Sequence, residues 1–469
     1  MDFTERLRAL LAVQRWFAGK ARAIISADLI ATVLLEKDLL ANLLRITYAD
    51  GGEETYFLPV VVEADQLRDA LCDEGACRRL LEVITQGEVA PATAPATRLE
   101  GGAIWGVHSA LFDALRGEPR EREPVRAASH DQSNSAIVFG TRFFLKVFRK
   151  VEPGLNPDYE IARYLTERTS FARLPRLAGA MEFRSTACPA MTLATLQERV
   201  PNDGDAWQAM LRDVRSTLEL ARPQAMDRIE RLGIRTAELH MALANATDNP
   251  AFAPESLTSD DCRLLAARLR RTAENVFQLL RQPPEAVDSA IAAQASELLA
   301  RGPALLNKFS NTLAGEPHCT KTRIHGDYHL GQVLCQGDDF MILDFEGEPA
   351  RSLAERTAKD SPLKDVAGML RSFSYAAYAG LFAFTEDDRA GFARLEPLAR
   401  SWQQQASAAF LRGYFASTQG ASFLPPDKRR LTALLDFFIV EKALYEVLYE
   451  LNHRPPWLRI PLAGILALA

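Results

Sequence analysis

The chain has 469 residues, of which 48% are hydrophobic and 25% charged, and its formal net charge is −6 at pH 7. This length is too great for one ordinary hydrophobic core, so we expect two or three globular domains. The acidic balance argues against a nucleic-acid partner, and the absence of any apolar stretch of about 18 residues argues against a membrane partner. Charges are scattered through the first helix pattern, and the six cysteines form no CxxC pair. Both features favour a cytoplasmic protein with reduced thiols.

Residues 1–88 are expected to form a small α+β subdomain. A helix pattern at the start is followed by two apolar segments, Leu43–Tyr48 and Thr55–Val62, which are typical of strands. They flank Asp50-Gly51-Gly52, a strong signal for a hairpin turn. The segment APATAPAT at 90–97 is then expected to be a linker, because its two prolines exclude continued secondary structure.

Residues 99–200 are expected to be rich in strands and residues 201–469 in helices. Strands are predicted at Ala136–Phe139 and Phe143–Phe148, followed by a helix that begins at the cap and first-turn proline Asn156-Pro157. The helical segments expected beyond residue 200 are 206–221, 224–245, 259–282, 285–301, 362–380, 394–418 and 427–452. A strand-rich lobe followed by a larger helical lobe is a two-lobed arrangement, and such folds place a ligand cleft between the lobes.

The most informative stretch is RIHGDYHLGQVLCQGDDFMILDFEGEP, residues 323–349. Two short apolar runs in it flank a polar turn and predict a hairpin. If the hairpin is centred near residue 338, Gln332 and Asp344 lie opposite each other, about 5 Å apart, unless a bulge shifts the register by one residue. Their oxygens, with Asp327 on the preceding loop, could then hold one hard cation.

These side chains match the parts of a phosphoryl-transfer site. In kinases the catalytic-loop pattern H-x-D-x-x-x-x-N precedes an Asp-Phe pair. Here the pattern is His325-Gly-Asp327, four further residues and Gln332, followed by Asp344-Phe345. Asp327 would orient or deprotonate the acceptor hydroxyl, and Gln332 and Asp344 would hold Mg²⁺ on the phosphates of ATP. Glutamine in place of asparagine still supplies a carbonyl oxygen, on a longer stem.

The other kinase parts are expected upstream. Lys146 is a lone cation in an apolar strand, where an ammonium needs an anionic partner. Glu160 in the next helix could supply it, as the strand lysine–helix glutamate pair does in kinases, or could simply favour the helix dipole. The segment in place of a Gly-rich phosphate loop contains Gln132, Ser133, Asn134 and Ser135. Its hydroxyls and backbone amides could cradle phosphates, less closely than glycines would.

Other interpretations of these residues stay open. The three oxygen-bearing side chains could be turn residues, and Lys146 could be an edge-strand lysine that reaches solvent. His325 and His329 around Asp327 could indicate a metallohydrolase, although no further His or Cys cluster lies nearby. His240, inside an apolar helix, is expected to be a core histidine. A nucleotide-binding module without catalysis could share the fold, but all the charged catalytic parts are present.

Residues 323–378 resemble the maltokinases, a branch of the aminoglycoside-phosphotransferase-like kinases. The similarity extends along nearly the whole chain through the motifs Arg15–Lys20, Gln132–Ser135, Leu145–Phe148, Asn156–Glu160, Tyr445–Glu450 and Arg454–Trp457. It implies an α+β, bilobal, protein-kinase-like fold. Residues 1–88 would be an N-terminal cap subdomain, 99–200 the nucleotide-binding lobe and 201–469 a mostly helical C-terminal lobe.

The resemblance also implies roles and a reaction. Asp327 resembles the catalytic aspartate, and Lys146 resembles the lysine on the α- and β-phosphates. The adenine-binding hinge would contain Gln197, Glu198 and Val200. The implied reaction is ATP plus maltose giving maltose 1-phosphate and ADP, with Mg²⁺ as cofactor and trehalose synthase as a functional partner. Glucosamine kinases share the motif, so glucosamine 6-phosphate is the alternative product.

A sugar acceptor needs paired polar groups and a flat aromatic surface. Such groups are offered by His325, Glu346, Lys442, Tyr445, Tyr449, Arg454 and Trp457. In the helix expected at 427–452, positions 442, 445 and 449 share one face. The tyrosines could instead be core residues with a tethered hydroxyl. The residues alone therefore leave open which sugar is the acceptor.

Overall fold

The computed structural model describes residues 2–63, 66–92, 102–117, 124–127, 134–222, 226–245, 248–282, 287–312, 315, 317–386 and 388–468. The chain forms two compact units, Met1–Pro201 and Asn202–Ala469, called here the first and the second unit. None of the helices in the described part of the chain is both long and apolar enough to cross a membrane.

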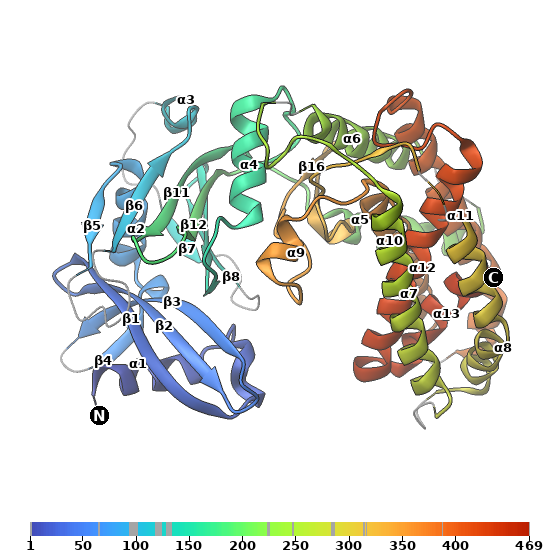
Figure 1. The fold of residues 1–469 in the computed structure, drawn as a ribbon, viewed down its shortest axis with the longest axis horizontal. Helices are drawn as coiled ribbons and strands as arrows, with labels where there is room; N and C mark the ends of the chain where they lie inside the picture. The colour runs from blue at the N-terminus through green and yellow to red at the C-terminus, as the bar shows by residue number, and fades with distance from the viewer. Residues whose placement is uncertain are drawn as a thin grey trace. The chain divides into compact units, whose positions relative to one another are not determined.

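The first unit begins with a curved antiparallel sheet (Figure 1). Its strands are β1 (Ile24–Glu36), β2 (Leu39–Tyr48), β3 (Glu53–Glu63), β4 (Gln66–Asp69) and β10 (Lys150–Val151). The order is β1-β2-β3-β10, with β4 also paired to β3. The predicted hairpin is confirmed: β2 and β3 pair, and Gly51 supplies the positive φ of +83° in their turn. Helix α1 (Phe3–Val13) buries Leu7 and Leu11 in a cluster with residues of this sheet.

A second sheet of seven strands completes the first unit. Its strands are β5 (Val89–Pro91), β6 (Ala103–His108), β7 (Val125–Ala127), β8 (Asn134–Phe139), β9 (Phe143–Phe148), β11 (Leu177–Arg184) and β12 (Met191–Glu198). The order is β5-β6-β11-β12-β9-β8-β7, which confirms the strands expected at 136–139 and 143–148. Pro91 lies in β5, so the linker prediction is wrong there; an edge strand tolerates proline because it need not donate a ladder bond. Residues 93–97 of that predicted linker lie outside the described residues.

Short helices accompany the two sheets of the first unit. They are η1 (Ala18–Ala21), η2 (Ala70–Cys72), α2 (Glu74–Thr85), α3 (Phe112–Arg116) and α4 (Pro157–Arg168). The predicted cap is confirmed, since the Asn156 side chain accepts a hydrogen bond from the Asp158 amide at 2.9 Å.

One hydrophobic core joins the two sheets. It runs from Ile30 in β1 through Leu80 in α2 to Leu196 in β12. A buried ion pair also crosses it: Arg149 lies 2.6 Å from Asp69. The region expected to be a cap and the strand-rich region after it therefore pack as one body.

The second unit is mainly helical, with four short strands. The helices are α5 (Ala206–Leu220), α6 (Asp227–Ala244), α7 (Ser259–Leu280), α8 (Ser289–Thr312), η3 (Leu330–Gln332), α9 (Leu353–Thr357), α10 (Leu363–Thr385), α11 (Arg389–Ser417), α12 (Lys428–His453), η4 (Pro455–Leu458) and α13 (Arg459–Leu466). The strands are β13 (Glu255–Ser256), β14 (Thr320–Lys321), β15 (Val333–Gln336) and β16 (Asp339–Ile342).

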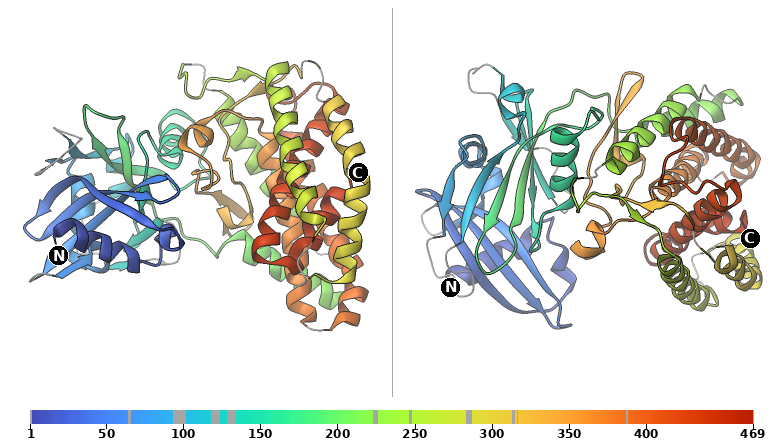
Figure 2. Two further views of the ribbon diagram at one scale, coloured as in Figure 1. Left: turned by 60° about the horizontal axis from the view of Figure 1, so that its bottom comes forward. Right: turned by 45° about the horizontal axis from the view of Figure 1, so that its top comes forward.

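All seven long helices expected from the sequence are present in this unit. Helices α10, α11 and α12 run side by side, as Figures 1 and 2 show, with α6 packed along α11. The backbones of α6 and α11 approach each other closely because glycines lie where the two helices meet. A Cβ on Gly233 would lie 2.1 Å from the Phe410 carbonyl oxygen, and one on Gly413 would lie 2.1 Å from that of Glu230. The same unit contains the segment that was expected from the sequence to be catalytic.

Candidate active site

Lys146 lies in the interior of the seven-stranded sheet. Strand β9 runs between β8 and β12, and Lys146 pairs in register with Ala136 and Thr195. The edge-strand interpretation of this lysine is therefore wrong. Its ammonium meets Asp158 Oδ2 at 3.0 Å, and the Asp158 side chain is only 1% exposed.

Asp158 is a partner of Lys146 that the sequence analysis did not single out. It lies two residues before Glu160, the acid expected from the sequence, and it forms an ion pair with the lysine. Both acids belong to the first turn of the helix, where Asn156 and Pro157 fix the start. The sequence indicates an acid in that turn, but the direction from which α4 meets the sheet decides which one is buried.

The segment expected to act as a phosphate loop is described only in part. Gln132 and Ser133 lie outside the described residues, whereas Asn134 and Ser135 begin β8. The Ser135 hydroxyl accepts a hydrogen bond from Arg149 Nε at 2.8 Å and is buried. This corrects the expectation for Ser135, because its side chain is engaged inside the first unit.

The expected adenine hinge begins in the last two residues of β12, Gln197 and Glu198. Gln197 is buried and pairs in register with Phe144, and Glu198 meets Arg176 at 2.7 Å. The Glu198 carboxylate thus has a structural partner, and its amide donates to the Arg176 carbonyl oxygen at 2.8 Å. A hinge role for Gln197, Glu198 and Val200 stays a prediction.

In the second unit the predicted hairpin is present, but its register differs by one residue. Val333 pairs with Ile342, and the turn is the two-residue Gly337-Asp338, in which Gly337 has a φ of +58°. The Leu343 amide donates to the Gln332 carbonyl oxygen at 3.1 Å. Gln332 therefore faces Leu343, and Asp344 lies one position beyond it.

The chain turns sharply at Asp344 after the hairpin. Its φ of +69° is in the left-handed region, which costs a residue with a side chain about 1–2 kcal/mol. Such strain is concentrated at functional sites. A carboxylate oxygen of Asp344 and one of Glu346 lie within 4.8 Å of each other. The structure thus groups Glu346 with the expected metal ligand, whereas the sequence assigned it to the acceptor.

The loop that carries Asp327 is held by a buried acid that sequence reasoning missed. Asp365, in the first turn of α10, accepts hydrogen bonds from the amides of His325 at 2.7 Å and Gly326 at 2.9 Å. Gly326 has a φ of +86°, which favours glycine at this turn. The available signal was an aspartate inside the apolar helical pattern at 362–380.

His325 shapes the same loop with its ring. Its Nε2 bonds the Leu343 carbonyl oxygen at 3.0 Å, and its Nδ1 accepts from the Asp327 amide at 3.4 Å. The residue is 1% exposed. Both nitrogens are therefore used by the backbone, which contradicts an acceptor contact for His325 and also the metallohydrolase interpretation.

His240 extends this support into the helical core. It is fully buried, as expected, and lies 3.2 Å from Asp365 Oδ2 and 2.9 Å from the Tyr414 hydroxyl. Burial by itself raises the pKa of Asp365, but the His240 hydrogen bond, the charges of His240 and His325 and the Gly326 amide outweigh it and lower that pKa. An ionised Asp365 can accept all three hydrogen bonds.

Asp327 itself meets a lysine from a distant helix. The Lys442 ammonium, on α12, lies 3.4 Å from Asp327 Oδ1 and 3.0 Å from Glu348 Oε1. Burial lowers the pKa of Lys442, but Asp327 and Glu348 raise it above its ordinary value overall. Burial likewise raises the pKa of Glu348, yet Lys442 and Arg351 bring it down to about 2. Glu348 was not singled out from the sequence.

The predicted face of α12 continues this surface. Tyr445 and Tyr449 are 41% and 44% exposed, so they are not core residues. The Lys442 ammonium lies 5.0 Å from the Tyr445 ring centre, and a cavity of about 40 Å³ is lined by Asp327, Lys442 and Tyr445. Arg454 lies over the Tyr449 ring at 5.5 Å. Of the acceptor residues expected on α12, Lys442 and Tyr445 thus line a cavity together with Asp327.

Comparison with known proteins decides the family. Residues 124–398 match the model of the phosphotransferase enzyme family, and residues 11–83 match that of the maltokinase N-terminal cap domain. The chain belongs to the phosphotransferase enzyme family. It is therefore a phosphotransferase, and the resemblance found in the sequence is confirmed.

Two relatives of known name are glucosamine kinases. The protein of Streptacidiphilus jiangxiensis is 27% identical over 339 residues, which cover 71% of this chain and 70% of the relative. That of Mycolicibacterium smegmatis is 25% identical over 382 residues, which cover 77% of this chain and 88% of the relative.

Solved structures of glucosamine kinase share the fold. A complex with glucosamine, ADP and inorganic phosphate has a TM-score of 0.70 at 20% identity, and another crystal form has 0.72 at 19%. Both comparisons cover 100% of this chain and 99% of the other. They confirm the kinase-like fold, with its N-terminal sheet cap and helical C-terminal part.

Proposed function

We propose that this phosphotransferase is an ATP- and Mg²⁺-dependent sugar kinase that converts maltose to maltose 1-phosphate. The single observation that carries the proposal is the contact of Asp327 with Lys442 on a helix face with exposed aromatic rings. A carboxylate beside such a surface can accept a hydrogen bond from a sugar hydroxyl while an aromatic ring covers the apolar face of the sugar.

The reaction is a transfer of the γ-phosphoryl group. The anomeric hydroxyl oxygen of the sugar attacks the γ-phosphorus, the bond to the β–γ bridging oxygen breaks, and ADP leaves. Asp327 orients the hydroxyl and takes its proton. Lys442 would hold the Asp327 carboxylate in place through the contact of their charged groups at 3.4 Å.

The nucleotide would be held by the first unit through Lys146. The pair with Asp158 orients its ammonium, as strand lysines are oriented in kinases. The Asn134 amide and the hinge residues Gln197, Glu198 and Val200 are proposed as further nucleotide contacts.

The oxygen donors that follow the hairpin suit Mg²⁺. Asp344 and Glu346 have neighbouring carboxylates, and Gln332 adds an amide oxygen, all hard ligands of the kind this ion prefers. We propose Asp344 with Gln332 or Glu346 as its ligands. When bound, the ion neutralises charge on the β- and γ-phosphates.

The charges around Asp327 favour a neutral acceptor over an amino sugar. Glu348 already meets Lys442 and Arg351, and an ammonium placed there would also meet the Lys442 charge. Glu441 is paired with Arg268 in the same way. The cap-domain match supports maltose as the neutral sugar.

Glucosamine is the second candidate, because the two relatives named above are glucosamine kinases. A sugar panel with ATP, followed by phosphorus NMR of the product, distinguishes the two. We expect an anomeric phosphate on maltose and little turnover of glucosamine. A 6-phosphate formed faster from glucosamine would overturn the choice of maltose, and no turnover with any sugar would overturn sugar kinase activity.

The proposed product also suggests a context. Maltose 1-phosphate would feed α-glucan synthesis, and trehalose synthase is proposed as a functional partner that supplies maltose. A cytoplasmic location is proposed on the same grounds, since the sequence pattern favours reduced cysteines.

A further inference from the structure

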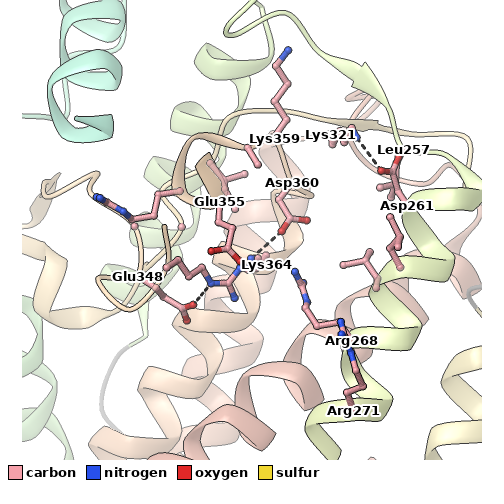
Figure 3. Close-up of a pocket in the computed structure, with 18 residues that line it drawn as sticks. Leu257, Asp261, Arg268, Arg271, Lys321, Glu348, Glu355, Lys359, Asp360 and Lys364 are labelled. Atoms are coloured by element: carbon pink, nitrogen blue, oxygen red, sulfur yellow. Dashed lines mark hydrogen bonds and ion pairs between the residues drawn. The ribbon is translucent and has the colours of Figure 1, made fainter. Parts of the chain in front are cut away.

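A second, larger pocket lies beside the catalytic loop and has no part in the proposed reaction. Its volume is about 310 Å³, against about 40 Å³ for the cavity that Asp327 lines. The two cavities share the lining residues Gly326, Glu348, Arg351 and Lys364. The larger one is closed on one side by α7 and on the other by the segment from Gly347 to Lys364, as Figure 3 shows.

This pocket is rich in positive charge. Seven of its lining residues are basic and four are acidic, an excess of three positive charges when all are ionised. The whole chain, by contrast, carries a formal charge of −6. A concave site lined mainly by one sign of charge concentrates ligands of the opposite sign.

Several of the basic side chains meet an acid within the pocket wall. Lys321 lies 3.0 Å from Asp261, and Lys364 lies 2.9 Å from Asp360, pairs that are drawn as dashed lines in Figure 3. Such pairs leave little net charge. The excess positive charge therefore comes from basic side chains that form no ion pair with an acid lining the pocket.

Two arginines of α7 form no ion pair with an acid that lines the pocket, among the residues that the structure describes. Arg271 makes no ion pair or hydrogen bond with any residue that the structure describes. Arg268 meets Glu441 at 2.5 Å, but its Nε is buried and has no hydrogen-bond acceptor in the described part of the chain. A buried donor without an acceptor costs free energy. An anionic ligand that accepts a hydrogen bond from it would remove this cost. Figure 3 shows both arginines on the α7 side, across the pocket from Glu348.

We propose that this pocket binds a small multivalent anion of phosphate chemistry, such as pyrophosphate or a sugar phosphate. Guanidinium groups match phosphate oxygens because their planar N–H donors bind two oxygens at once. The volume suits a ligand of sugar-phosphate size, since pockets for small molecules begin at about 300 Å³.

The ligand would also act on the proposed acceptor site. Arg351 lies 2.5 Å from Glu348, which in turn bonds Lys442 beside Asp327. If a bound anion formed an ion pair with Arg351, the contact between Arg351 and Glu348 would be lost. Glu348 would then interact with Lys442 alone, and Lys442 would shift relative to Asp327. This consequence depends on the proposed function, whereas the binding itself does not.

Titration calorimetry of the full chain tests the binding. Inorganic pyrophosphate and glucose 6-phosphate are titrated separately, with sodium chloride of matched ionic strength as reference. We expect saturable binding of at least one of them, weakened by about tenfold or more when Arg268→Gln and Arg271→Gln are combined, which is about 1.4 kcal/mol. Tighter binding of glucose 6-phosphate would assign a sugar phosphate, and tighter binding of pyrophosphate an inorganic ligand.

Two control variants make the result specific. Arg263→Gln changes an arginine of α7 that is 78% exposed and does not line the pocket, so binding should equal that of wild type. Lys146→Ala removes the proposed nucleotide contact and should also leave the binding intact. The proposal is overturned if neither anion binds saturably. It is equally overturned if binding persists in the double variant or disappears in Lys146→Ala, which would assign the anion to the nucleotide site.

Discussion

Lys442 places its ammonium 3.4 Å from Oδ1 of Asp327, although 115 positions separate the two residues in the chain. The contact crosses from the middle of α12 to the loop before the hairpin, so it depends on the packing of the whole helical unit. It also draws Glu348 into the same group, at 3.0 Å from the ammonium. We expect this group to set the position of the Asp327 carboxylate.

Replacing Lys442 by methionine should therefore impair catalysis more than nucleotide binding. The change removes the only cation that the structure shows beside Asp327 within the described residues, so we expect kcat to fall by about 10²-fold. The free energy of unfolding should fall by about 1–2 kcal/mol, because charged hydrogen bonds in a partly exposed group are lost. Steady-state kinetics and urea unfolding measure the two effects.

Lys428→Met is the matched control, since Lys428 is an exposed lysine at the start of the same helix. It should change neither quantity appreciably. Wild-type kcat in Lys442→Met would contradict the role given to this lysine.

Asp365→Asn should act through the position of the loop rather than through the chemistry. The amide keeps the size of the side chain but loses the charge and one acceptor that hold His325, Gly326 and His240. We expect a loss of about 1–3 kcal/mol in the free energy of unfolding and a lower kcat, with little change in nucleotide affinity. Thermal unfolding, steady-state kinetics and ADP titration measure these three quantities. A variant with wild-type stability and kcat would contradict the scaffold role.

The stability that Glu348 contributes should depend on pH. Its pKa is about 2 in the folded protein against an ordinary value of 4.5, so the contribution is fully present above pH 4.5 and lost as the pH falls through about 2. A shift of this size corresponds to about 3 kcal/mol. The difference in unfolding free energy between wild type and Glu348→Gln should shrink by that order over this range.

Glu219→Gln provides the reference for this pH series, because Glu219 is a surface carboxylate that is 47% exposed on α5. Its difference from wild type should stay nearly constant. A pH-independent difference for Glu348→Gln would mean that Lys442 and Arg351 do not stabilise the ionised form.

The proposed role of Lys146 in nucleotide binding is tested by a comparison between two acids of α4. Asp158→Asn should weaken ADP binding about tenfold, because Lys146 loses the partner that orients it. Glu160→Gln, two positions on in the same helix, should change the affinity by about twofold at most. Fluorescence or calorimetric titration with ADP and Mg²⁺ measures both affinities. A larger loss of affinity in Glu160→Gln than in Asp158→Asn would contradict the role given to Asp158.

The features that the sequence predicted well depend on neighbouring residues. Gly51 turns the β2–β3 hairpin by its own backbone, and Asn156 caps α4 by bonding an amide two residues away. The hairpin between Asp327 and Asp344 was likewise predicted, because its two apolar runs and its turn are continuous in the chain. Local chemistry suffices for such features.

The features that were not predicted from the sequence depend on contacts between residues far apart in the chain, or on a choice between similar turns. Asp365 reaches His325 across 40 positions, which no local pattern reveals. The hairpin register was wrong because a two-residue turn at Gly337 fits the apolar runs as well as a longer one. Glu348 has no motif of its own, and only the position of α12 shows that it shares Lys442 with Asp327.

The central claim is that Asp327 activates the acceptor hydroxyl, and Asp327→Asn tests it most directly, with Asp338→Asn in the exposed hairpin turn as control. Phosphorylated sugar and ADP affinity are measured on the same preparations. We predict that Asp327→Asn lowers kcat by about 10³-fold and leaves the ADP dissociation constant within about threefold, while the control behaves as wild type. Wild-type turnover in Asp327→Asn would contradict the account.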